Sequence, residues 1–245
     1  MLAIVLLVVI GACTERPPPD RDVPAAGGTA GEGPNAGGPV SSGRIPACTM
    51  FVGYSQTFQW YRASFESVVP DERFELLWGG GRAIRSWADP DTWANANLES
   101  ACATEDPDRI VIDVGVGTDG LGDVGWYASL IRDAVATARE LYPGAQIGLQ
   151  PIVGGPGYRP CPIEDRLGTS AVNASVAAPA VAEAIDDVVA EDPTLFRGPN
   201  PQLASCDMYR DALGHLTTFA HDGSVPGQVY AGREIGAFYL AAPQS

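Results

Sequence analysis

Chemically useful side chains follow three short apolar runs of this 245-residue chain. The segments are Gly53-Tyr54-Ser55, Gly79-Gly80-Gly81 and Gly115–Asp119. Taken singly, each has a plain structural explanation, because glycines allow sharp turns and a serine often caps a helix. A serine hydroxyl can also attack an ester, but only where a base removes its proton. The glycine-rich stretches lack the lysine of a phosphate-binding loop, which argues against nucleotide binding.

Histidines and soft metal ligands are scarce. The chain has two histidines, His215 and His221, and no Cys-x-x-Cys pair, which argues against a zinc enzyme. Asp113, Asp119 and Asp123 could offer carboxylate oxygens to calcium, but their spacing matches no EF-hand loop. We expect solvated turn acids here, with strand alternation directing Asp113 into a polar network. We therefore expect no metal or other cofactor.

Strands and helices alternate from Cys48 onward. Short apolar runs bounded by turn residues predict buried strands, and apolar residues recurring at three and four predict helices. Strands separated by helices of this length indicate an α/β fold with a parallel sheet of about five strands, covered on both faces. The active site of such a sheet lies at the carboxyl ends of its strands. The expected strands are Thr49–Val52, Phe74–Trp78, Arg109–Val114, Gln146–Leu149 with Pro151–Val153, and a weaker one near Leu195-Phe196.

Four helices are expected around this sheet. The clearest has its apolar positions between Tyr127 and Tyr142, and another spans Ala171–Ala190 despite Pro179. A third covers Asp207–Phe219, where we expect His215 to pack or lie on the surface rather than to catalyse. The last begins at Pro226, a favourable first-turn residue, with Ile235, Phe238 and Tyr239 directed inward.

The order of these segments resembles that of the SGNH (GDSL-type) hydrolases, lipases and esterases on a flavodoxin-like sheet. The family's Gly-Asp-Ser block corresponds to Phe51–Thr57, which implies Ser55 as the nucleophile. Gly81 corresponds to the glycine after the second strand, and Val116–Asp119 corresponds to the Gly-x-Asn-Asp block. The Asp-x-x-His block corresponds to Asp222–Val225. The resemblance implies a three-layer α/β domain.

Three positions depart from the family pattern. Tyr54 stands where the family has the Asp beside the nucleophile, and Thr118 stands where it has the oxyanion-hole Asn. Val225 occupies the position of the catalytic His, and valine cannot accept a proton. A base would then have to come from His221, which adjoins Asp222.

Two functions therefore remain open. The first is a cell-envelope serine hydrolase that acts on ester bonds, as an esterase or a carbohydrate deacetylase. Ser55 would be the nucleophile, Gly81 and Thr118 the oxyanion hole, and Asp222 the partner that orients His221. The alternative is a catalytically inactive SGNH-like domain that binds a glycan or an acylated ligand. A third, an acidic structural lipoprotein without a ligand, leaves the ordered motifs unexplained.

The tryptophans near the second and third strands could indicate which kind of ligand the domain binds. Their flat apolar faces could stack on sugar rings, although we expect core packing for most of them. The four are Trp78, Trp87, Trp93 and Trp126.

The N-terminal residues have the composition of a targeting signal. Leu2–Ala12 is nearly all apolar but too short to span a bilayer, and suits a signal peptide. Ile10–Cys13 resembles the bacterial lipobox, so we expect a signal peptide at 1–12 and lipidation of Cys13; a plain signal peptide is the alternative. Residues 13–47 are rich in Pro and Gly and predict a tether, leaving 48–245 as the SGNH-like domain. Thr14 after the cysteine favours the outer membrane.

The remaining cysteines are even in number, as expected of an exported chain with disulfides. Three pairings are possible. We favour Cys48–Cys102 and Cys161–Cys206, because each closes a loop of moderate length; free buried thiols are the alternative.

The charge of the chain limits the classes of partner that it can bind. Acids outnumber bases 30 to 15, which gives a formal net charge of −15. All the bases are arginines. Such a chain is a poor ligand for nucleic acid or anionic headgroups, so we expect a small-molecule or glycan ester partner and membrane contact through a lipid anchor alone.

Overall fold

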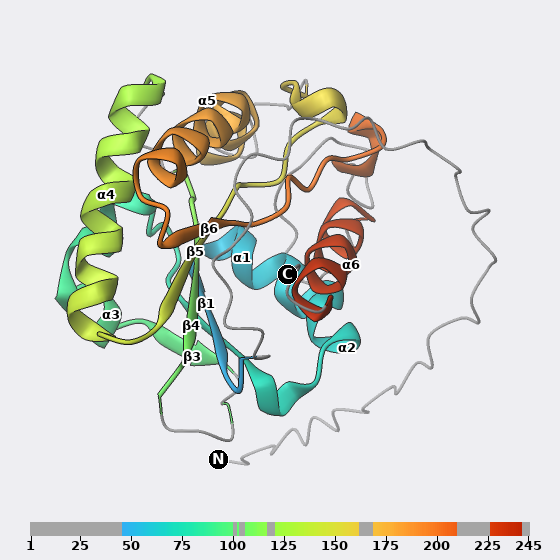
Figure 1. The fold of residues 1–245 in the computed structure, drawn as a ribbon. Coiled ribbons are helices and arrows are strands. Elements are labelled where there is room, and N and C mark those ends of the chain that lie inside the picture. The colour runs from blue at the N-terminus through green and yellow to red at the C-terminus, as the bar shows by residue number, and fades with distance from the viewer. Residues whose placement is uncertain are drawn as a thin grey trace, which may run out of the picture. The chain divides into compact units, whose positions relative to one another are not determined.

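The computed structural model describes residues 46–99, 102, 106–116, 121–161, 169–209 and 226–241. In this part of the chain six strands form one sheet, in the order β3-β2-β1-β4-β5-β6 (Figure 1). All neighbouring pairs are parallel except β2 and β3, which are antiparallel. The strands are β1 (Thr49–Gly53), β2 (Phe74–Trp78), β3 (Asn97–Glu99), β4 (Arg109–Asp113), β5 (Gln146–Gln150) and β6 (Leu195–Arg197).

Helices cover both faces of the sheet and complete a three-layer α/β fold (Figure 1). On one face lie α3 (Pro90–Ala94), α4 (Val124–Leu141) and α5 (Thr169–Glu191). On the other face lie α1 (Ser55–Trp60), α2 (Glu66–Val68) and α6 (Pro226–Leu240). Among the described helices, none combines the length and the apolar character needed to cross a membrane. Among the described residues, short 3-10 turns lie at Asp71–Arg73, Ile84–Ala88, Pro156–Tyr158 and Cys206–Tyr209.

The central strands are buried on both sides because successive side chains alternate between the two helical layers. In β1, Met50 and Val52 enter a largely aliphatic core with α4 and α5. Phe51 enters the opposite core, which is rich in aromatic rings. In β4, Ile110 and Ile112 join the aliphatic side, and Val111 joins the aromatic side. Asp113 follows the same alternation and is therefore directed into the aromatic layer.

The aromatic core supports the segment that follows β1. The ring of Phe51 lies edge-on to four rings, with centroids 5.4 Å from Trp60, 6.3 Å from Tyr61, 5.0 Å from Phe65 and 5.0 Å from Tyr239. Trp60 ends α1, and the chain continues helically through a π-helical segment, Tyr61–Phe65, into α2. Edge-to-face packing of this kind is favourable beyond the apolar area that it buries.

Helix α6 crosses the π-helical segment at close range. A Cβ atom at Gly232 would lie 2.3 Å from the Trp60 carbonyl oxygen and 2.4 Å from Ser64 Oγ. Ser64 Oγ also donates a hydrogen bond of 2.6 Å to the Val229 carbonyl. A glycine is therefore required for α6 to approach closely enough to hold the end of α1.

Most of the expected elements are confirmed, and some expectations need revision. All five expected strands are present, but β5 ends at Gln150, so the strand expected over Pro151–Val153 was wrong. The sheet also has an antiparallel edge strand, β3, that was not foreseen. Ile235 and Tyr239 are buried as expected, whereas Phe238 is 41% exposed, so its inward placement was wrong. The helix expected over Asp207–Phe219 lies mostly outside the described residues, and its first residues belong to the 3-10 turn Cys206–Tyr209.

Candidate active site at the carboxyl edge of the sheet

Ser55 stands at the carboxyl end of β1, as the first residue of α1. Its side chain is only partly buried, whereas its neighbours Tyr54 and Gln56 are buried. Tyr54 has an extended backbone, with φ −123° and ψ −163°, so the chain changes direction abruptly between strand and helix. The backbone N–H of Tyr54 donates to Thr57 Oγ1 at 3.0 Å, which closes the turn. The serine turn, as we call Gly53–Thr57, therefore presents Ser55 at the edge where active sites of parallel sheets lie.

A buried carboxylate lies beneath the serine turn. Asp113, at the end of β4, is 2% exposed and accepts hydrogen bonds at Oδ2 from Thr57 Oγ1 (2.6 Å) and Trp60 Nε1 (3.4 Å). Within the described residues, its Oδ1 atom has no hydrogen-bond partner. Burial raises the pKa of Asp113 to about 7, and the two hydrogen bonds oppose that rise.

This position of Asp113 corrects part of the sequence interpretation. The expected polar network is present, but Asp113 is not a solvated turn acid. Asp123 does fit that description, because it is exposed and caps α4 by accepting the Trp126 N–H at 2.8 Å. Asp119 lies outside the described residues.

Tyr54 has a packing role in the structure. Its side chain is 3% exposed, and its hydroxyl donates a hydrogen bond to Gln56 Oε1. A Cβ atom at Gly115 would lie 2.4 Å from the Tyr54 ring, so the ring occupies the space that a side chain at 115 would take. The residue that replaces the family Asp thus fills the gap between the serine turn and the end of β4.

The glycine loop after β2 lies beside the serine turn. β1 and β2 pair in parallel with Gly53 opposite Trp78, and the Gly79 N–H donates to the Gly53 carbonyl at 3.2 Å. Gly81 is exposed and has φ +72°, a left-handed conformation that favours glycine. The ends of β1 and β2 therefore bring Ser55 and Gly81 to the same edge of the sheet.

Several of the predicted site residues cannot be placed relative to Ser55. Thr118, Asp222 and both histidines, His215 and His221, lie outside the described residues, as does Val225. Cys13 lies outside them as well. The assignment of these residues stays a prediction.

The tryptophans divide between core and surface. Trp87 and Trp93 are buried, as expected for core packing, whereas Trp126 is 38% exposed. Trp78 is partly exposed and stacks on Phe58, with ring centroids 4.3 Å apart. Phe58 was missed in the sequence, although its place three residues after Ser55 on one helical face could have indicated it.

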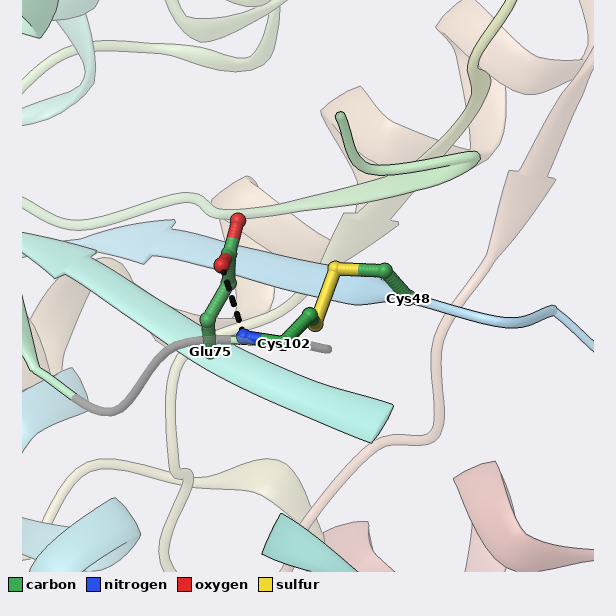
Figure 2. A group of neighbouring side chains, drawn as sticks. All are labelled: Cys48, Glu75 and Cys102. Carbon is green, nitrogen blue, oxygen red and sulfur yellow. Dashed lines mark hydrogen bonds between the residues drawn. A yellow bond between two sulfur atoms is a disulfide. The ribbon is translucent and has the colours of Figure 1, made fainter. Parts of the chain in front are cut away.

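Both favoured disulfides are present, Cys48–Cys102 and Cys161–Cys206. Figure 2 shows the first beside Glu75, whose Oε2 accepts the Cys102 N–H at 3.2 Å. Among the described residues, these two cysteines and Glu75 are the one cluster close enough to hold a metal. Metal ligation requires thiolates, and here both sulfurs are bonded to each other. Burial raises the pKa of Glu75, and the Cys102 N–H opposes that rise. The cluster therefore ties β1 to the segment after β3.

Comparisons with known proteins find likenesses among solved structures. No family model matches the sequence, and no curated protein matches it. A mutant of a family two carbohydrate esterase from Clostridium thermocellum aligns at 11% identity and TM-score 0.46, covering 79% of this chain and 63% of that one. An acetyl xylan esterase from Butyrivibrio proteoclasticus aligns at 14% identity and TM-score 0.43, covering 80% and 64%. The chain thus spans less than two thirds of both proteins. A family 3 carbohydrate esterase from Talaromyces cellulolyticus aligns at 12% identity and TM-score 0.47, covering 78% and 95%.

The ionisation of Asp113 predicts a specific pH dependence of stability. The pKa of Asp113 is about 7 in the folded protein and 3.8 in the reference state. At pH values between these two, folding is therefore accompanied by the uptake of a proton at Asp113. This contribution to stability is fully present below pH 3.8 and is lost as the pH rises through 7. The Asp113→Asn variant lacks this contribution. Lowering the pH from 8 to 5 should therefore stabilise the wild-type protein relative to Asp113→Asn by about 2 to 3 kcal/mol.

Urea unfolding of both proteins at pH 5 and pH 8 measures this difference. Other titrating groups are shared by the two proteins and cancel in the comparison. A stability difference that stays constant between the two pH values would show that Asp113 titrates normally.

Proposed function

We propose that the domain is a serine hydrolase that cleaves ester bonds, with Ser55 as the nucleophile. The observation that carries the proposal is the placement of Ser55. It is partly exposed at the carboxyl end of a central strand, on a turn whose neighbouring residues are buried and hydrogen-bonded. A serine needed only to cap a helix would not require a buried carboxylate beneath its turn.

The proposed reaction is acyl transfer through Ser55. The hydroxyl oxygen attacks the ester carbonyl while a base takes its proton, and the tetrahedral oxyanion forms. Collapse of this intermediate breaks the bond to the leaving alcohol, which receives the proton, and leaves an acyl-serine. Water activated by the same base then releases the acid and restores the hydroxyl. We assign the base to His221, oriented by Asp222.

The oxyanion is proposed to accept hydrogen bonds from the backbone N–H groups of Ser55 and Gly81 and from the Thr118 hydroxyl. Gly81 is exposed, and among the described residues no atom beyond its chain neighbours lies within 4 Å of its Cβ position, which leaves room there for a substrate. Each such donor typically contributes about 3 to 4 kcal/mol to the transition state.

The charge of the protein favours neutral esters as substrates. With a formal net charge of −15, the chain repels polyanions and carries no excess of bases to attract them. We propose acyl groups on glycans or small alcohols as the substrate class, and the reaction as written uses no cofactor.

A binding domain without turnover is the second candidate. It is favoured by Val225 at the position of the family's catalytic His and by the buried Tyr54 at the position of its Asp. In that case Ser55 would contact an acylated ligand and would not attack it.

Covalent labelling separates the two candidates. The full chain should react with a fluorophosphonate probe and hydrolyse a short-chain aryl ester, and Ser55→Ala should lose both activities. His221→Ala should lower the rate by at least about 10³-fold, because the hydroxyl loses its base. Ser67→Ala, an exposed serine on the same helical run, is the matched control and should behave as wild type. No labelling of folded wild-type protein would reject the hydrolase and leave the binding domain.

We also propose that the chain is a lipoprotein of the bacterial cell envelope, held at the outer membrane. The supporting feature is the apolar Leu2–Ala12 segment followed by Cys13 and the Pro- and Gly-rich residues 14–47. In this arrangement 1–12 is the signal peptide, 13–47 is the lipidated tether and 48–245 is the hydrolase domain.

Metabolic labelling with a radioactive fatty acid tests the anchor. The wild-type chain expressed in a bacterium should incorporate label and sediment with membranes. Cys13→Ser should incorporate none. Equal incorporation by both proteins, or incorporation by neither, would contradict the lipid anchor.

A further inference from the structure

The mechanism above gives no role to Asp113, a buried ionisable group at the end of β4. Asp113 is not among the residues that would touch the substrate, and its carboxylate is almost completely removed from solvent. Burying such a group is costly unless something in the structure requires it. Its hydrogen-bond partners indicate what that requirement is.

A chain of two hydrogen bonds connects β4 to the serine turn. Asp113 Oδ2 accepts from Thr57 Oγ1 at 2.6 Å, and Thr57 Oγ1 accepts from the Tyr54 backbone N–H at 3.0 Å. Thr57 is itself fully buried. The hydroxyl has a single proton, so donation to Asp113 leaves its lone pairs directed at the turn. The carboxylate thereby fixes the orientation of the Thr57 hydroxyl.

Gly53 makes this chain sterically possible. A Cβ atom at residue 53 would lie 2.0 Å from Thr57 Oγ1 and 2.7 Å from Thr57 Cβ. Any side chain there would expel the Thr57 hydroxyl from its place. Gly53, two residues before the nucleophile, is therefore needed for the Thr57 contact as well as for the bend of the chain.

Trp60 completes the fixation from the other end of α1. Its Nε1–H donates to the same Asp113 oxygen at 3.4 Å, and its ring packs against Phe51. One carboxylate oxygen thus contacts the first and the last turns of α1. The helix that begins with Ser55 is held to β4 at both ends.

We propose that Thr57 and Asp113 are positioning residues for Ser55, which hold the Gly53-Tyr54 peptide and so fix the direction in which the chain enters Ser55. The inference rests on the proposed function for its catalytic consequence, but its structural part stands independently. The next peptide along the chain carries the Ser55 N–H that is proposed to bind the oxyanion, and its Tyr54 carbonyl accepts the Phe58 N–H at 3.1 Å. Fixing the turn sets the direction of both the nucleophile and the oxyanion donor, and misplacement of reacting groups by about 1 Å can cost about 100-fold in rate.

Two variants at Thr57 separate hydrogen bonding from packing. Thr57→Val keeps the shape and removes the hydroxyl, whereas Thr57→Ser keeps the hydroxyl and removes a methyl group. Both are made in the full chain, and folding is checked by near-ultraviolet circular dichroism. The first readout is hydrogen exchange of the Tyr54–Thr57 backbone amides. The second is the rate of fluorophosphonate labelling at Ser55.

We expect Thr57→Val to increase amide exchange in the serine turn and to slow labelling by about 10- to 100-fold. We expect Thr57→Ser to stay within about threefold of wild type in both readouts. The inference is overturned if Thr57→Val matches the wild type, or if Thr57→Ser is impaired as severely as Thr57→Val. If Thr57→Val does not fold, Thr57→Ser decides alone, because loss of its exchange protection would show that the methyl group is what matters.

The exchange measurement distinguishes failure of this inference from failure of the proposed function. A wild-type protein that never labels would reject the hydrolase, while faster exchange in Thr57→Val alone would still support the hydrogen-bonded turn. Normal labelling and normal exchange in Thr57→Val would reject the positioning role and leave the hydrolase intact.

Discussion

The structure depends on one buried carboxylate that holds the start of a helix to the centre of a sheet. Asp113 reaches from β4 under α1, where it accepts hydrogen bonds from Thr57 and Trp60. An ionised carboxylate in such surroundings is unfavourable unless donors surround it. Two donors serve one of its oxygens, and the pKa of Asp113 rises to about 7 because they compensate only partly for burial. The ionised form of Asp113 therefore lowers the stability of the folded protein at the position where the serine turn must be fixed.

The two faces of the sheet contribute differently to this arrangement. The face covered by α4 and α5 is largely aliphatic, and Tyr54 of the serine turn packs on it together with Trp87, Trp93 and Tyr127. The face covered by α1 and α6 is aromatic, with Phe51 at its centre, and it contains the contacts beneath Ser55. Gly232 lets α6 press against the end of α1. Rigid packing of this kind keeps the site's supporting residues in one conformation.

The fold was largely predictable from the sequence because apolar runs and glycines mark the parallel strands. Strand β3 was not predictable from the sequence. It is an antiparallel edge strand of three residues, Asn97–Glu99, which are too few and too polar to form a recognisable strand pattern. The exposure of Phe238 was not predicted, because helical spacing alone does not show how far along α6 the neighbouring elements reach. Strand alternation predicted the direction of the Asp113 side chain, but its burial and its partners were not predicted, because Thr57 is 56 residues away in the chain. Spacing cannot establish whether His221 reaches Ser55.

The most direct test of this account is the titration of Asp113 itself. Carbon-13 NMR of the full chain, with the Asp113 carboxyl resonance assigned by comparison with Asp113→Asn, follows this one group through pH. We predict a midpoint near 7, because the carboxylate is buried between the sheet and α1. A midpoint near 4, as for an aspartate in water, would contradict the claim that burial outweighs the two hydrogen bonds to Asp113.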